Sequence, residues 1–165
     1  MYFRSSYDES ESAKRIHVPE KMSRKWGIFN GLSYEPKGTI DVDIDQNSLE
    51  LVIEYYSIID CENVDIPKPL PYEASFVLHF PNALGNELRN DAMWIDKIAQ
   101  LTTDSANSTN PNQGRLQLWR LFEAANLLHA QKLLDLCSAR IAFEFKNMKP
   151  AELRRVLSIK NDLVN

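Results

Sequence analysis

The 165-residue chain has few of the residues that build cross-linked or metal-bound sites: two cysteines, three histidines and five glycines. Cys61 lies in a polar stretch and Cys137 on an apolar helical stripe, so a disulfide framework is not expected. His17, His79 and His129 are far apart, and none has a cysteine or second histidine at metal-ligand spacing. We therefore expect no bound metal, and a reducing compartment, the cytoplasm or nucleus.

Several motifs are also missing. There is no Gly-rich phosphate-binding loop of the common kinds, and no pattern indicates a nucleophile with its base, so we expect neither an enzyme nor a cofactor. No apolar run approaches the length of a membrane span, and the first residues do not resemble a signal peptide. The net charge of −4 argues against a general nucleic-acid partner.

The most informative stretch is residues 116–163, which predicts three helices in series. The first spans about 116–128 and the second about 131–148, and the third opens at Pro150, a residue that suits a first helical turn. The middle helix carries two apolar stripes on different sides, one through Cys137 and one through Leu136 and Phe143. One interpretation is a central helix wrapped by its own chain. The other, which we favour, is one side for the core and one for a partner.

The N-terminal part alternates strands and helices. Residues 2–7 and 15–18 could pair as a hairpin, and residues 22–32 predict a helix. Residues 39–44 alternate apolar and acidic side chains as in a half-buried strand, and a helix follows at about 48–59, capped by Asp45 or Asn47. These elements predict an α/β (α+β) fold with a small sheet.

The middle of the chain is less regular. Residues 60–71 read as an acidic, proline-bearing linker, and residues 76–80 as an extra strand or plug. Trp94, Ile95, Ile98 and Leu101 fit one face of a helix, whereas residues 102–114 are almost entirely polar.

The C-terminal third resembles the S-phase-kinase-associated (Skp) family, whose members link cullin scaffolds to F-box proteins. Phe122–Leu128 resembles the family's L-x-x-A-A-N-Y-L segment, and Leu133–Cys137 resembles the following G-L-L-D-V-T-C. Lys149–Arg154 resembles T-P-E-E-I-R, and Ser158–Leu163 resembles F-N-I-K-N-D-F. Four short matches in family order make a specific signal, and the first sixty residues match more loosely.

The resemblance implies a BTB/POZ fold, a small mixed sheet with surrounding helices followed by C-terminal helices. Residues 1–128 would form the BTB/POZ-like domain, with a divergent insertion at about 61–114. Residues 129–165 would form a shortened F-box-binding region, because the family's later helices have no counterpart here. The implied function is a non-catalytic adaptor of an SCF-type ubiquitin ligase, with a cullin and an F-box protein as partners.

The resemblance also implies contact residues. The family's cullin-facing pair is an asparagine followed by an aromatic residue, and here Asn126 is followed by Leu127. The side chains carried over to F-box binding are Leu136, Phe143, Leu157, Ile159 and Leu163.

Two alternatives stay open. Asn126 could simply bond local backbone at a helix end, and the F-box set could be ordinary core. The chain could also be a diverged structural protein that self-associates or binds F-box proteins without a cullin. An elongin-C-like adaptor is a further alternative that Ser158–Leu163 fits less well.

Overall fold

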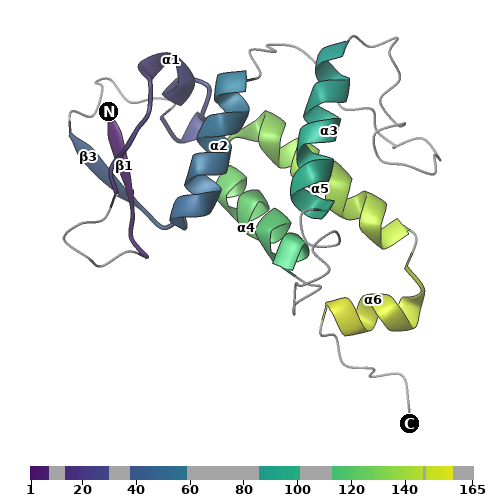
Figure 1. Ribbon diagram of the computed structural model, residues 1–165. Helices are drawn as coiled ribbons and strands as arrows, with labels where there is room; N and C mark the ends of the chain where they lie inside the picture. The colour runs from purple at the N-terminus through teal and green to yellow at the C-terminus, as the bar shows by residue number, and fades with distance from the viewer. Residues whose placement is uncertain (8–13, 30–37, 59–85, 101–112, 147, 158–165) are drawn as a thin grey trace.

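The computed structural model (Figure 1) describes residues 1–7, 14–29, 38–58, 86–100, 113–146 and 148–157. The strands are β1 (Tyr2–Ser5), β2 (Ile16–His17) and β3 (Thr39–Val42). The helices are α1 (Glu20–Ser23), the 3-10 helix η1 (Gly27–Phe29), α2 (Gln46–Ile58), α3 (Asn86–Gln100), α4 (Gln113–Leu127), α5 (Gln131–Lys146) and α6 (Pro150–Val156). A small sheet beside a larger helical part confirms the predicted α+β fold class.

The sheet is mixed, with strand order β2-β1-β3. β1 pairs antiparallel with β2, as the predicted hairpin requires, and parallel with β3. Alternation along β1 places Phe3 in the core, while Arg4 makes two hydrogen bonds to the carboxylate of Asp41 on β3, at 2.6 and 2.9 Å. The guanidinium lowers the pKa of Asp41 through these bonds. The exposed side of the sheet is therefore polar.

The helix expected over residues 22–32 is not continuous. It is divided into α1 and η1, and residues beyond 29 lie outside the described part. Between them, the amide of Gly27 donates to the carbonyl of His129 at 3.1 Å, and the amide of Ile28 donates to Leu128 at 3.3 Å. Both amides are thus committed to a distant turn, so they cannot extend an α-helix. The inward residues are nevertheless as predicted, since Met22 and Trp26 are buried.

α2 is capped by Asp45, one of the two predicted caps. The amide of Ser48 donates to the Asp45 carboxylate at 3.0 Å, a side-chain cap of the kind that stabilises helix starts. Leu49, Val52 and Tyr55 are fully buried, so this face belongs to the core. The helix starts at Gln46, two residues before the predicted start.

The helical core is built by α2, α3, α4 and α5. α4 packs against α2, α3 and α5, and α3 also packs against α5 (Figure 1). The predicted helices at 116–128 and 131–148 are confirmed, with slightly different ends. The expected helical face around Ile95 and Ile98 is also confirmed, and α3 extends back to Asn86. Its core contacts are Ala92, Ile95, Ile98 and Ala99.

α6 begins at Pro150, as predicted, and contributes no buried residue. Figure 1 shows it beyond the end of α5, away from the sheet. Lys149 occupies the N-cap position without a side-chain hydrogen bond to the helix. The other predicted features outside the described residues are Cys61, His79, the apolar run 76–80, Leu101, Ile159 and Leu163.

Candidate protein-binding surfaces

The turn between α4 and α5 has a defined hydrogen-bond pattern. His129 adopts a positive φ of 52°, unusual for a residue with a Cβ. Its amide donates to the Asn126 carbonyl at 3.0 Å, and the amide of Ala130 donates to Ala125 at 2.8 Å. These two bonds define a Schellman motif, which satisfies the last carbonyls of α4. The turn is thereby fixed, and it presents the carbonyls of Leu128 and His129 to η1.

η1 and this turn together form an exposed surface. Asn126 and His129 are exposed, and the side chains of Leu127 and Ile28 are each 38% exposed. We call Ile28, Asn126, Leu127 and His129 the turn surface. Ile28 was not predicted as a surface residue, although a signal was present: Ile28 is apolar but lies off the stripe formed by Met22, Trp26 and Phe29.

The second stripe of α5 requires a correction. Leu136 is only 1% exposed, and Leu133 on the same stripe is fully buried, as is Cys137 on the other stripe. The helix is therefore buried on both sides by its own chain, chiefly by α3 and α4, and not by a partner. Sequence periodicity showed that both sides need covering but could not show that α3 and α4 supply the cover. Leu136 belongs to the core.

Phe143, farther along the same stripe, lies at the edge of the core. It is half-buried, and the guanidinium carbon of Arg140 lies 5.7 Å from its ring centroid. Arg140 is itself buried and forms ion pairs with Asp96 of α3 at 2.9 Å and Glu144 at 3.2 Å. Glu144 also lies 3.5 Å from Arg115 of α4. These charges connect three helices around Phe143, so its role is partly structural.

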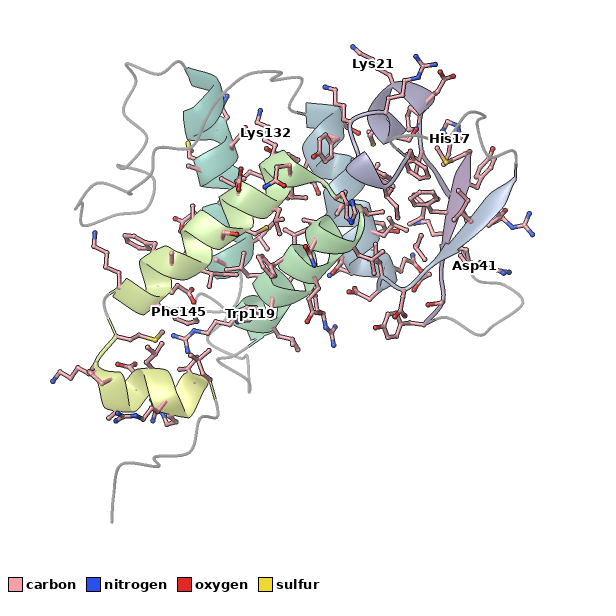
Figure 2. The ribbon with its side chains drawn as sticks, turned by 180° about the vertical axis from the view of Figure 1, so that it is seen from behind. His17, Lys21, Asp41, Trp119, Lys132 and Phe145 are labelled. Carbon is pink, nitrogen blue, oxygen red and sulfur yellow. The ribbon has the colours of Figure 1, made fainter. Side chains whose placement is uncertain are left out.

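A second exposed apolar region lies at the other end of α5. Trp119 of α4 lies 6.2 Å from Phe145 of α5, between ring centroids, and both rings are half-buried. Figure 2 shows this pair on the side of the molecule where α6 follows. On α6, Leu153 and Val156 are half-buried, and Leu157 just after it is 37% exposed. We call Leu153, Val156 and Leu157 the α6 surface.

The two surfaces lie at opposite ends of α5, because the turn surface precedes Gln131 and α6 follows Lys146 (Figure 1). A 16-residue helix is about 24 Å long at 1.5 Å per residue. The two surfaces therefore share no residue and are separated by about the length of α5.

The buried titratable groups link helices. The Tyr55 hydroxyl donates to Asp91 of α3 at 3.1 Å, and the ammonium of Lys132 of α5 lies 3.8 Å from the same carboxylate oxygen. Burial is the main reason that the pKa of Tyr55 is raised. Burial likewise raises the pKa of the Cys137 thiol, which keeps it protonated and unreactive.

Within the part of the chain that the structure describes, no three metal-binding side chains come together. Over the same ranges, none of the helices has both the length and the hydropathy needed to cross a bilayer.

Residues 131–164, which include α5 and α6, match the Skp1 family, dimerisation domain. The chain is also 28% identical over 116 residues to the SCF ubiquitin ligase complex protein SKP1b of Dictyostelium discoideum. That alignment covers 64% of this chain and 68% of the relative.

Proposed function

Because the chain is a diverged member of the Skp family, we propose that it is a non-catalytic adaptor of an SCF-type cullin–RING ubiquitin ligase. It would bridge a cullin and an F-box protein in ubiquitin-dependent protein degradation, in the cytoplasm and nucleus. The observation that carries the proposal is the separation of two exposed apolar surfaces by the length of α5. The relative from Dictyostelium discoideum is named as a protein of such a complex, which supports the proposal.

The turn surface is the proposed cullin site. Asn126 and Leu127 are exposed there, next to a backbone turn held by hydrogen bonds from η1. Leu127 keeps apolar contact area where the family resemblance expects an aromatic residue, but it has no ring edge or hydroxyl. Ile28 adds a second exposed aliphatic side chain from a neighbouring segment. The surface is thus apolar enough to bind a partner, with altered chemistry at its centre.

The α6 surface is the proposed F-box site, and Phe143 of α5 is a further predicted contact. α6 contributes no buried side chain, as expected for a helix whose apolar face is covered by a partner. Leu157 is its most exposed side chain in the described part. Ile159 and Leu163 remain predicted contacts. Leu136 is no longer part of this set because it is buried.

Leu127→Lys tests the cullin site. The substitution places a charge in the proposed interface, and we expect it to weaken binding of a purified cullin N-terminal domain by at least about tenfold. Binding of an F-box protein should be unchanged. Leu116→Lys is the matched control, because Leu116 is a 48% exposed leucine near the other end of α4. Surface plasmon resonance with both partners gives the comparison.

Two results would contradict the proposal. One is wild-type protein that binds neither partner at micromolar concentration. The other is an equal loss of cullin binding in Leu116→Lys and Leu127→Lys, since the site would then not be centred on the turn surface.

A second function is a structural protein that self-associates, or binds F-box proteins, without a cullin. The observation in its favour is the aliphatic Leu127 in place of the expected aromatic residue. Sedimentation velocity separates the two functions: the adaptor forms a complex with the cullin domain, whereas the structural protein forms oligomers of itself and leaves the cullin free.

A further inference from the structure

The segment around α6 differs in charge from the rest of the chain. Residues 149–157 contain three basic residues, Lys149, Arg154 and Arg155, and one acidic residue, Glu152, although the chain has a net charge of −4. Among the described residues, Arg154 and Arg155 take part in no ion pair. Within the described ranges, no carboxylate therefore competes with an acidic partner for these two guanidinium groups.

The two arginines occupy different positions relative to the α6 surface. At about 100° per residue, Leu153, Val156 and Leu157 share one face of the helix. Arg154 borders this face, whereas Arg155 lies on the opposite side. Their burial agrees, since Arg154 is half-buried and Arg155 is exposed. Only Arg154 is placed to contact a partner that covers the three apolar side chains.

We propose that the α6 surface binds an amphipathic helix of a different protein, which carries an acidic side chain beside its apolar stripe for Arg154 to bind. This inference rests on the proposed function and adds the chemistry of the partner segment. The spacing of Leu153, Val156 and Leu157 forms a ridge of the kind that packs against another helix. Glu152 lies at the other border of the ridge and repels an acidic residue there, so the contact also selects the orientation of the partner helix.

The positive charge of α6 argues against a second copy of this chain as the partner that covers the α6 surface. Self-association through α6 would bring the basic residues of two copies close together without acidic residues in equal number. Like charges brought together at an interface oppose association. An acidic segment of another protein gains from the same charges.

The test uses the full chain and two synthetic amphipathic helical peptides of about 18 residues, a length sufficient for helix formation. They differ only beside the apolar stripe, where one carries glutamates and the other lysines. We expect fluorescence anisotropy to show that the glutamate peptide binds at least about tenfold more tightly, and that roughly 0.5 M salt removes most of this preference.

Charge reversal then locates the contact. Arg154→Glu should weaken binding of the glutamate peptide about tenfold and restore binding of the lysine peptide. Arg155→Glu makes the same charge change on the same helix, and it should change the affinity for either peptide less than about threefold. Circular dichroism confirms that both variants remain folded. Equal effects of the two variants, or equal binding of the two peptides, would overturn the inference. Sedimentation that shows a dimer dissociated by Leu157→Lys would overturn it in favour of a second copy.

The two proposals can fail separately. If an F-box protein and a cullin bind but Arg154→Glu leaves F-box affinity unchanged, the charge contact is wrong and the adaptor function stands. If neither partner binds while the peptide preference follows Arg154, the adaptor function is wrong and α6 binds acidic helices of another kind.

Discussion

The two ends of α5 differ in what surrounds them. In its first half, Leu133, Leu136 and Cys137 are all buried against the helical body. In its last turns Phe143 and Phe145 are only half-buried, and α6 beyond them contributes no buried residue. The same helix thus passes from a fully buried core into a region where its apolar side chains are only partly covered.

The two ends of α5 should therefore contribute very different amounts to the free energy of unfolding. A fully buried aliphatic side chain contributes about 1.5–3 kcal/mol relative to an exposed one. α6 has seven residues, fewer than the roughly 12–15 that an isolated helix needs for marginal stability in water. The stability of the fold therefore resides in the sheet and α2–α5, and we expect α6 to gain order when a partner covers it.

Leu136→Ala gives the largest expected effect. Leu136 is 1% exposed, so truncation should leave a cavity and lower the free energy of unfolding by about 2–5 kcal/mol. Leu157→Ala removes the same atoms from a side chain that is 37% exposed, and its cost should stay within about 0.5 kcal/mol. Urea denaturation of both variants measures the difference. Similar losses in the two would remove the distinction between core and α6 surface.

Much of the fold could be predicted because local patterns determine it. The hairpin of β1 and β2, the Asp45 cap and the start of α6 at Pro150 all depend on a few adjacent residues. The break between α1 and η1 could not be predicted in this way. It depends on hydrogen bonds from Gly27 and Ile28 to a turn about 100 residues later in the chain, counted from the residue numbers.

The candidate site was predicted only in part for a similar reason. Periodicity located both stripes of α5, but it does not identify what covers each one. The assignment of Leu136 to a partner failed because α3, from a segment without a strong family resemblance, packs against α5 together with α4. Asn126 and Leu127 are exposed as a contact pair must be, and their binding role remains a prediction.

Alkaline pH should have a smaller effect on the free energy of unfolding, and this effect arises in the core formed by the sheet and α2–α5. Burial raises the pKa of Tyr56 from 10.0 to about 12, against a partly compensating backbone hydrogen bond with Leu133. The unfolded chain therefore ionises first as pH rises, so stability is complete below about pH 10 and is lost between about pH 10 and 12. In Tyr56→Phe, the fall in unfolding free energy should be shallower by up to about 1.4 kcal/mol per pH unit.

Tyr7→Phe is the control for this measurement, because Tyr7 is 68% exposed. Urea titrations at several pH values between 9 and about 11 compare the slopes. The buried Tyr55 should keep some slope in both variants, since its pKa is also raised. A slope in Tyr56→Phe equal to that of the wild type would show that Tyr56 ionises freely in the folded protein.

The smallest expected effect is at His129, which joins the buried half of α5 to the turn surface. Its φ of 52° costs a residue with a Cβ about 1 kcal/mol, whereas glycine adopts this conformation freely. His129→Gly should therefore raise the free energy of unfolding, by up to about 0.6 kcal/mol after the greater entropy of glycine in the unfolded chain is counted. His129→Ala keeps the Cβ and should give no such gain.

Because the carbonyl of residue 129 still accepts from Gly27, cullin binding should be retained in the glycine variant if Leu127 and Ile28 are the principal contacts. A glycine variant that is more stable but no longer binds would assign the His129 imidazole itself to the interface.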